Sequence, residues 1–323
     1  MTLNKQNINI LEPKNQLKLY GYHKWFSSFH NLYRKKMLPN IILLSGAKGI
    51  GKSTFCYHFA NFLLSQNESN YYLIDNYCIN ENNASYQLVK KNIHPNFFLL
   101  EVNRTENEIK IEKVRKLLNF LSKSTYSMNF KIILIDNLEN LNLSSSNALL
   151  KSIEEPQPNT FFFLTHSIEN QILDTMKSRC NIFKLFFSLE EKKDMFQNLI
   201  NQYDSFDIND YNQDDCYYLT PGNFIKYLST LDLKKYSKDD IFINISNLII
   251  KYKKDKDLEV LYFISLFIEK FYHNLTFKNP RKVYSILSNF SLILKQISNL
   301  KKFNLDDKAT FIWIENILKN EER

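Results

Sequence analysis

An eight-residue segment at positions 46–53, with the sequence GAKGIGKS, constrains the fold of this 323-residue chain more than any other feature. It fits the pattern G-x-x-x-x-G-K-[ST], in which glycines let the backbone wrap closely around a phosphate group. The apolar run 41–44 before it is typical of a buried strand. After it, Phe55, Phe59 and Leu63 recur every four residues and indicate a helix. The segment therefore predicts a strand, a phosphate-binding loop and a helix in succession.

The chemistry of this loop favours ATP as its ligand. Successive backbone N–H groups would point at phosphate oxygens, and the start of the following helix adds the positive end of its dipole. Lys52 would neutralise the β and γ phosphates, while Ser53 would ligate Mg²⁺. A glycine-rich turn that persists as scaffold without a ligand is the alternative interpretation. The ATP-binding residues predicted from the loop are Gly46, Gly49, Ile50, Gly51, Lys52, Ser53 and Thr54.

A second apolar run, residues 132–135, ends at Asp136 and is typical of a strand that brings an aspartate to Mg²⁺. Asp136 and Ser53 are therefore the candidate magnesium ligands, although an aspartate that merely ends a strand is the alternative. Active ATPases of this kind place a glutamate next, to polarise the attacking water, but the residue here is Asn137. We expect Glu139 to point elsewhere. The sequence therefore predicts weak or absent ATP hydrolysis at this site.

Strand and helix patterns alternate through the first two-thirds of the chain. Further strands are expected at residues 97–102, 161–164 and 182–186, and helices at 111–121 and 144–155, the latter capped by Ser144, Ser145 or Ser146. This alternation predicts an α/β fold with a five-stranded parallel sheet covered on both faces. From residue 188 onward the strand signals fade and amphipathic helices follow. Residues 66–96 are polar and rich in asparagine, and we interpret them as a loop-rich insertion.

The composition is that of a folded protein with a basic balance. Lysine and arginine number 42 against 34 acidic residues, which gives a formal net charge of +8. DNA would suit this charge. However, many Lys, Asn, Ile, Phe and Tyr with only 5 glycines and 7 prolines are the residue usage of an AT-rich genome, and the lysine pairs are scattered. No apolar stretch is long enough to span a bilayer and the first ten residues do not resemble a signal peptide, so we expect a cytoplasmic protein.

Three further motifs follow in order: NALLKSIEEP at 147–156, FFFLTH at 161–166 and KSRC at 177–180. Their succession resembles bacterial clamp-loader subunits of the AAA+ class, which carry an "NALLK-LEEP" helix, a sensor-1 strand and an "SRC" motif in this order and at similar distances. Residues 46–64 and the Thr165-His166-Ser167 variant of sensor 1 are similar to the delta-prime subunits of alphaproteobacteria. The resemblance covers about residues 20–230.

The resemblance implies roles for three positions. Arg179 would be an arginine finger that reaches toward the γ phosphate in a neighbouring subunit, where a fixed guanidinium stabilises developing charge. An arginine that stabilises the end of a short helix is the alternative. Thr165 would be the sensor-1 residue. In the sensor-2 stretch, Asn223 stands where active members of the family carry arginine, which again weakens hydrolysis.

Many relatives carry a zinc-binding cysteine cluster after the first helix of the domain. Here the four cysteines, Cys56, Cys78, Cys180 and Cys216, lie far apart, and only Cys78 falls between residues 66 and 96. Because a structural zinc site needs cysteines at short spacing, we expect no zinc.

The resemblance also implies three domains: an AAA+ P-loop nucleotide-binding domain at 1–187, a helical lid at 188–235 and a helical C-terminal collar domain at 236–323. Such a chain would belong to the DNA polymerase III holoenzyme, in a pentamer with delta and gamma/tau subunits. That complex uses ATP to load the sliding clamp onto primed DNA during replication, with no membrane partner. Two other classes remain open: a self-sufficient P-loop ATPase, and a nucleotide-dependent kinase with a small-molecule acceptor.

Overall fold

The computed structural model describes residues 12–102, 108–123, 130–202, 218–230, 237, 240–303 and 307–322. The chain divides into two compact units. The first, here called the α/β unit, comprises residues 11–199 together with 220–222. The second, here called the helical unit, contains residues 200–219 and 223–323. Cys216 and residues 231–235, which the sequence analysis assigned to the lid, lie outside the described residues.

The α/β unit is built on a five-stranded sheet whose paired strands are all parallel. The strands are β1 (Ile41–Gly46), β2 (Phe97–Leu100), β3 (Lys131–Ile135), β4 (Thr160–Ser167) and β5 (Asn181–Lys184), and their order in the sheet is β2-β3-β4-β1-β5. The predicted five-stranded parallel sheet is thus confirmed. The second and fifth strands are shorter than expected, because β2 ends at Leu100 and β5 ends at Lys184.

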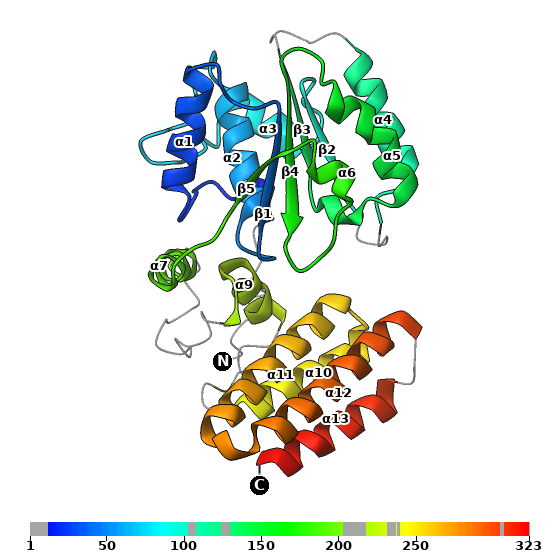
Figure 1. The fold of residues 1–323 in the computed structure, drawn as a ribbon. Helices are drawn as coiled ribbons and strands as arrows, with labels where there is room; N and C mark the ends of the chain where they lie inside the picture. Colours follow the sequence, from blue (N-terminus) through cyan, green and yellow to red (C-terminus); the bar gives the residue numbers. More distant parts are fainter. Residues whose placement is uncertain are drawn as a thin grey trace. The chain divides into compact units, whose positions relative to one another are not determined.

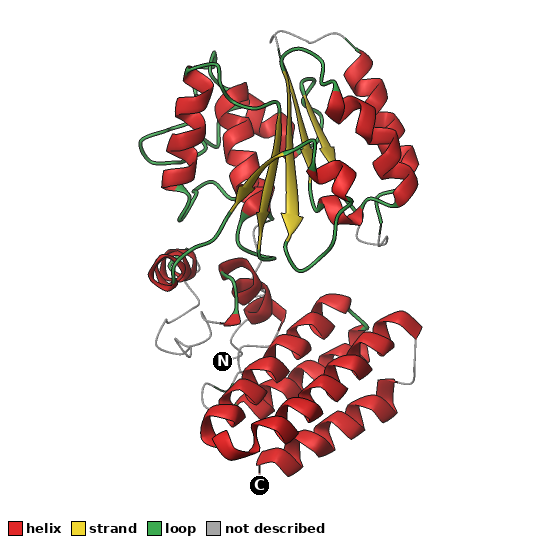
Figure 2. Cartoon of the chain, viewed as in Figure 1, coloured by secondary structure: helices red, strands yellow, loops and turns green. Residues whose placement is uncertain are grey.

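Helices cover both faces of this sheet (Figures 1 and 2). On one face, Ile42 and Leu44 pack with aromatic residues of α1 (His23–Arg34) and α2 (Lys52–Leu64), beside α3 (Ala84–Lys90). On the other, Ile41 and Leu43 pack with α4 (Ile111–Ser122), α5 (Leu143–Glu154) and α6 (Asp174–Lys177). Alternate residues of one strand therefore enter two different cores, as the two-residue period of a strand requires. This explains the uninterrupted apolar runs in β1, β3 and β4.

The helix that was predicted to begin at one of the serines 144–146 begins one residue earlier. Its cap is Asn142, whose side-chain oxygen accepts a hydrogen bond from Ser145 N at 2.9 Å. Ser145 and Ser146 are buried, and the Ser145 hydroxyl donates to the carbonyl oxygen of Ile109 at 2.7 Å. The prediction of a serine cap was therefore wrong. The Ser145 hydroxyl does not cap α5, because it bonds to the chain that precedes α4.

The asparagine-rich stretch after α2 is more ordered than predicted, since it contains α3. Asn83 caps this helix by accepting a hydrogen bond from Tyr86 N at 2.6 Å. Asn83 also accepts from the amide of Asn61, on α2, at 3.0 Å. The carboxylate of Glu68 accepts from the backbone N–H of Ala84 at 2.9 Å. The buried side chain of Asn83 thus holds this insertion to α2, and the half-buried Glu68 joins two parts of the insertion to each other.

Left-handed backbone occurs at several turns that contain no glycine. The φ angles are 56° at Lys36, just after α1, 56° at Asn92, just after α3, and 58° at Asn159, just before β4. Such angles favour glycine, and L-residues tolerate them less well.

Among its described residues, the helical unit contains four long helices, each of which packs against two of the others. They are α10 (Ile241–Asp255), α11 (Leu258–Lys278), α12 (Val283–Phe303) and α13 (Asp307–Glu322). α11 packs against α10 and α12, and α13 packs against the same two helices. A fifth helix, α9 (Pro221–Thr230), adds Tyr227, whose ring lies 4.4 Å from that of Phe267 on α11. The expected all-helical C-terminal region is present. Among the described residues, every helix is too short or too polar to cross a membrane.

Candidate functional site

The loop predicted to wrap a phosphate connects β1 to α2. Gly51 has a φ of 97°, in the left-handed region, and directly precedes the first residue of α2. A Cβ atom on Gly46 would lie 2.7 Å from the carbonyl oxygen of Leu185, a contact that side chains do not make. Ser53 and Thr54 fall in the first turn of α2. The sequence thus folds locally as predicted, with the loop at the start of a helix.

Every glycine of the chain lies in this loop, contacts it, or adjoins a residue that contacts it, although glycine is required at position 21 by a φ of 75° and by the Met195 side chain, whose Sδ would clash with a Cβ atom there. Three of the 5 glycines, Gly46, Gly49 and Gly51, belong to the loop itself. Gly21 precedes Tyr22, whose hydroxyl donates a 3.0 Å hydrogen bond to the carbonyl oxygen of Ile50. The N–H of the fifth, Gly222, donates to the carbonyl oxygen of Gly49 at 2.9 Å. The glycines of this chain therefore gather at one place.

The side chain of Lys52 is buried against the loop. Its Nζ donates hydrogen bonds of 2.8 Å to the carbonyl oxygens of Gly46 and Ala47. Burial lowers the pKa of Lys52, and three carboxylates act in the opposite direction, in the order Glu139, Glu169 and Asp136. The ammonium group is therefore held at the loop, in acidic surroundings.

Asp136 joins the loop to the neighbouring strands. Ser53 Oγ donates a 2.5 Å hydrogen bond to Asp136 Oδ1, and Thr165 Oγ1 donates to the same oxygen at 2.7 Å. Asp136 directly follows β3, and Thr165 lies in β4, between β3 and β1 in the sheet. The carboxyl ends of parallel strands meet at one edge, which is where ligands bind in such sheets. The structure thus brings together both candidate magnesium ligands and the candidate sensor-1 residue.

Asn137 adopts the left-handed conformation, with a φ of 59°, and its backbone N–H donates to Thr165 Oγ1 at 2.8 Å. Asparagine tolerates this backbone better than most L-residues. An amide at this position offers no group that can accept a proton from water.

Glu139, in the short helix η2 (Leu138–Asn140), is oriented differently from the prediction. Its Oε1 accepts hydrogen bonds from Ser167 N at 3.1 Å and from Asn170 Nδ2 at 3.3 Å. Its Oε2 is buried and finds no hydrogen-bond partner among the described residues. Glu139 is also the carboxylate that acts most strongly on Lys52. The turn of η2 thus directs the Glu139 carboxylate to the end of β4, where it is close enough to Lys52 to raise the pKa of that lysine.

A distant segment of the chain also reaches the loop. Thr220 Oγ1 donates a 2.7 Å hydrogen bond to the carbonyl oxygen of Lys48, and a Cβ atom on Gly222 would lie 2.7 Å from the carbonyl oxygen of Gly49. Both residues belong to the stretch 219–223, which resembles the sensor-2 stretch of the family. The next residue, Asn223, is buried in the helical unit, where its amide donates to the hydroxyl of Tyr262 at 3.2 Å. Thr220 and Gly222 therefore both bond to backbone carbonyl groups of the loop.

Arg179 lies just beyond α6 and contacts its own domain. Its Nε and Nη2 both donate to Glu154 Oε2 at 3.2 Å, and its Nη1 donates to the carbonyl oxygen of Thr175 at 2.9 Å. The side chain retains 30% of its exposure. The guanidinium is therefore fixed at the surface between the ends of α5 and α6.

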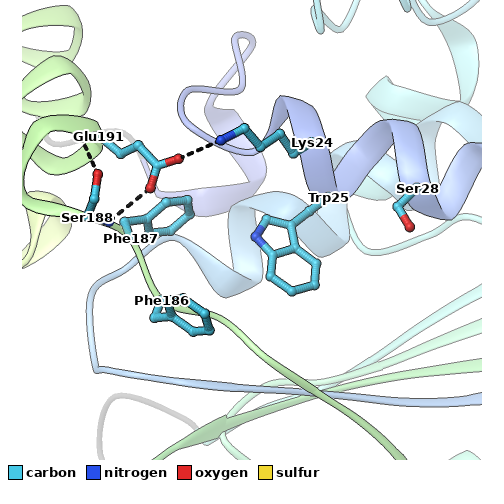
Figure 3. A pocket seen from close by; sticks show the side chains of 7 residues that line it. All are labelled: Lys24, Trp25, Ser28, Phe186, Phe187, Ser188 and Glu191. Carbon is cyan, nitrogen blue, oxygen red and sulfur yellow. Dashed lines mark hydrogen bonds and ion pairs between the residues drawn. The ribbon is translucent and has the colours of Figure 1, made fainter.

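A groove lies on the same unit, lined from α1 and from the segment that leads from β5 to α7 (Leu189–Ile200) (Figure 3). Its volume is about 790 Å³. Lys24 and Glu191 form an ion pair of 3.2 Å across it, and Phe186 retains 76% of its exposure. The sequence analysis assigned no function to these residues.

The residues at the carboxyl edge of the sheet fit a phosphate chain with a divalent cation. They provide backbone donors at the start of α2, the ammonium of Lys52, and a carboxylate beside the Ser53 hydroxyl. Sequence reasoning missed Tyr22 and Glu169, and it placed Thr220 in the sensor-2 stretch without its contact to Lys48. A glycine beside Tyr22 was the one available signal, because the contacts of Glu169 and Thr220 join residues far apart in the chain.

Comparison with known proteins finds similarity to subunits of DNA polymerase III. A family described as DNA polymerase III, delta subunit, matches residues 21–187. The DNA polymerase III subunit delta' of Pseudomonas aeruginosa is 36% identical over 138 residues, which cover 43% of this chain and 40% of that protein. The DNA polymerase III subunit gamma of a Buchnera aphidicola strain is 33% identical over 171 residues, covering 52% of this chain and 44% of that protein. The matches thus span less than half the length of these relatives.

Among solved structures, a DNA polymerase III gamma subunit-related protein from Thermotoga maritima aligns with a TM-score of 0.47 and 17% identity, covering 91% of this chain and 99% of that one. The match of the delta-subunit family to residues 21–187 covers more than half of the 323 residues. The chain therefore belongs to the DNA polymerase III delta-subunit family, and it is of the delta-prime type.

Proposed function

We propose that this chain is a clamp-loader subunit of the DNA polymerase III holoenzyme that binds ATP with Mg²⁺ and supports ATP-dependent loading of the sliding clamp onto primed DNA. Family membership supports the role in replication. The observation that carries the rest is the meeting of Lys52, Ser53 and Asp136 at one edge of the sheet, beside an amide at position 137. Such a site is built to bind nucleotide and poorly equipped to hydrolyse it.

In this proposal the loop from Gly46 to Thr54 wraps the phosphates with its backbone, and Lys52 neutralises their charge. Ser53 and Asp136 hold the Mg²⁺, which supplies further charge neutralisation when bound. Thr165, bonded to both Asp136 and Asn137, links this site to β4 as the sensor-1 residue.

Arg179 acts outside its own site. A guanidinium held at the surface by Glu154 has the fixed geometry that stabilisation of a phosphoryl group in a neighbouring subunit requires. The alternative, an arginine that stabilises the end of α6, draws support from its bond to the Thr175 carbonyl. Both functions use the same side chain, so only a measurement on the assembled complex separates them.

The partners in this proposal are the delta and gamma/tau subunits, in a pentamer that also binds the clamp and primed DNA. Residues 1–187 would form the AAA+ P-loop domain, 188–235 the lid and 236–323 the collar domain. In the helical unit, Phe277 and Tyr284 retain 75% and 91% of their exposure, which suits a surface that another subunit covers.

Co-purification tests the proposal directly. Tagged chain, co-expressed with the delta and gamma subunits of the same genome, should elute with them as one complex whose ATPase rises with clamp and primed DNA. A chain that elutes alone, while delta and gamma assemble without it, would contradict the proposal.

Autonomous ATP hydrolysis is a second candidate function, and Glu139 is the observation that favours it. Its buried Oε2 has no partner among the described residues and lies in the surroundings of Lys52, as a residue that polarises water would. Steady-state turnover of the isolated chain decides the matter. Our first proposal predicts negligible turnover, whereas a rate of about one per second that both Lys52→Ala and Glu139→Gln abolish would establish the second.

A further inference from the structure

The carboxylate of Glu169, in the α/β unit, accepts a hydrogen bond from a backbone N–H of the phosphate loop. Glu169 Oε1 accepts a 3.2 Å hydrogen bond from the N–H of Lys48, the third residue of the loop. Backbone N–H groups of this loop are the donors that bind phosphate oxygens. Glu169 therefore places a negative charge where the loop would otherwise meet a negatively charged ligand.

The position of Glu169 is set by the backbone on both sides of it. Ile168 N donates to the carbonyl oxygen of Gly46 at 3.3 Å, which ties the end of β4 to the start of the loop. Asn170 N donates to the carbonyl oxygen of Ser167 at 3.0 Å, and the ring of His166 bonds the Asn170 carbonyl oxygen at 3.0 Å. The chain around Glu169 is thus fixed against the loop, and only the exposed side chain of Glu169 is free to turn away.

Glu169 differs in this respect from the other two carboxylates that act on Lys52. Asp136 accepts hydrogen bonds from two hydroxyl groups, and Glu139 is anchored by a backbone N–H and an amide. Glu169 is exposed, and among the described residues it accepts one hydrogen bond, from Lys48 N. Releasing it costs little, because an exposed charge regains water as it leaves.

We propose that Glu169 lowers the affinity of the nucleotide site, as an internal anion that competes with nucleotide phosphate for the Lys48 N–H. This proposal rests on the proposed ATP binding. Nucleotide enters only as the carboxylate leaves, and Glu169 weakens binding further through repulsion between like charges. The ligand class it selects against is any anion that reaches this end of the loop.

Replacing Glu169 by glutamine tests the competition, because glutamine keeps the shape and removes the charge. Glu169→Gln should bind ATP–Mg²⁺ about three- to tenfold more tightly than wild type in calorimetry, as expected for one exposed charge. The gain should shrink at high salt, where exposed charges are screened. Asp75→Asn, which removes an exposed negative charge of the same unit, should leave the affinity unchanged.

A second readout needs no nucleotide. In protein labelled with ¹⁵N-lysine, the backbone amide signal of Lys48 should move in Glu169→Gln and stay in place in Asp75→Asn. An unmoved Lys48 signal would show that the contact does not form, and would overturn the inference. Equal or weaker ATP binding by Glu169→Gln would also overturn it, since a carboxylate that merely orders the loop would lower affinity when removed.

Failure of the proposed function gives a different result. In that case neither wild type nor Glu169→Gln binds ATP at millimolar concentration, whereas the Lys48 amide still reports the contact. If wild type binds ATP and Glu169→Gln binds it no more tightly, the proposed function is retained and only the role of Glu169 is rejected.

Discussion

Lys52 and His58 are two of the buried ionisable side chains of α2, and their hydrogen-bond partners decide what each one does. Lys52 lies at the start of the helix and is bonded to carbonyl oxygens of the loop, which a ligand would also approach. His58 lies further along the helix, between the hydroxyl of Tyr72 and the carbonyl oxygen of Gln16, both at 3.0 Å. With a carbonyl on one side, the ring donates there and accepts from the tyrosine. Lys52 is thus placed at the phosphate loop, whereas His58 satisfies buried polar groups in the core.

Lys52→Ala should abolish ATP binding, because it removes the one ammonium of the loop that is buried beside Asp136. Calorimetry with ATP–Mg²⁺ measures this loss. Lys48→Ala is the matched control, since it removes a lysine side chain from the same loop but keeps the backbone N–H. We expect Lys48→Ala to retain most of the affinity. Retained binding by Lys52→Ala would place the nucleotide elsewhere.

His58 should make the protein less stable in mild acid. Burial lowers the pKa of His58 from its ordinary value of about 6.5 to about 3. Between these two pH values the unfolded chain binds a proton that the folded chain does not, so the free energy of unfolding falls as the pH drops below about 6.5. Urea unfolding at about pH 7.5 and about pH 5.5 should show this loss in wild type, and a smaller loss in His58→Gln. The exposed His23, replaced by glutamine, should leave the loss unchanged.

At the scale of elements, α7 begins with a reciprocal pair of hydrogen bonds. Ser188 N donates to Glu191 Oε2 at 2.9 Å, and Glu191 N donates to Ser188 Oγ at 3.2 Å. This capping box satisfies N–H groups that the first turn of a helix leaves without partners. Lys24 adds an ion pair from α1. The start of α7 is therefore fixed next to the groove of Figure 3.

Glu191→Ala should destabilise the protein by about 0.5–1 kcal/mol at neutral pH, as loss of a cap does. The backbone hydrogen bond from Ser188, and then the bond from Lys24, hold the pKa of Glu191 below its ordinary value. Its stabilisation is therefore complete above the unfolded pKa and is lost as the pH falls through the lower folded pKa.

Urea unfolding at neutral pH and at about pH 3 measures the difference between Glu191→Ala and wild type, which should narrow in acid. Glu190→Ala, an exposed glutamate of the same turn, should cost less. Equal losses for the two variants would mean that charge near the helix start, rather than the capping box, provides the stability.

The sequence predicted the elements that have a strong local pattern. The strands β1, β3 and β4 were found because they contain apolar runs that are buried on both faces, and the phosphate loop because its spacing is strict. The helix α1 was not predicted, since aromatic residues such as Phe26 and Phe29 lie among polar ones and pack only once α2 is present. The cap at Asn142 was missed because three serines nearby offered an equally good signal.

The site was predicted in its local part only. Gly46 to Thr54, Asp136 and Thr165 each carry a motif, and the parallel sheet brings them together. The direction of Glu139 depends on the turn that follows β3, which no motif specifies. Contacts such as Thr220 with Lys48 join residues 172 positions apart, and their geometry exists only after both segments have folded.

At the scale of the whole molecule, the function that we propose extends beyond this chain. Its own site lacks a carboxylate at position 137, while Arg179 is held at the surface with its guanidinium fixed. In the proposed function, the chain contributes to catalysis through the arginine that it offers to a neighbouring subunit. Its importance can therefore be measured only within the assembled complex.

Arg179→Ala should lower the clamp- and DNA-stimulated ATPase of the assembled loader while leaving the chain folded. An arginine that serves a neighbouring site is worth about a thousandfold or more at that site. The loss in the whole complex should be smaller, because other sites keep their own arginines. Arg179→Lys should also lose activity, since an ammonium cannot reproduce the planar fork.

Thermal unfolding of the isolated chain provides the control for this experiment. One exposed ion pair contributes little, so Arg179→Ala should unfold within a few degrees of wild type. A mutant loader with full activity would make Arg179 a bystander. A variant that no longer folds would make it a structural residue of its own domain.

All 5 glycines lie in or near the phosphate loop, so glycine has not been used at the left-handed turns in the rest of the chain. Those turns are positions where a substitution by glycine could raise the stability of the protein. Turns elsewhere place Lys36, Asn92 and Asn159 in left-handed backbone, with φ angles of 56°, 56° and 58°. This backbone costs about 1–2 kcal/mol at Lys36 and less at the two asparagines, and glycine would remove that cost at an entropic loss of about 0.5–1 kcal/mol. Thermostable variants can therefore be sought at surface turns, in positions where no contact with the nucleotide site would be disturbed.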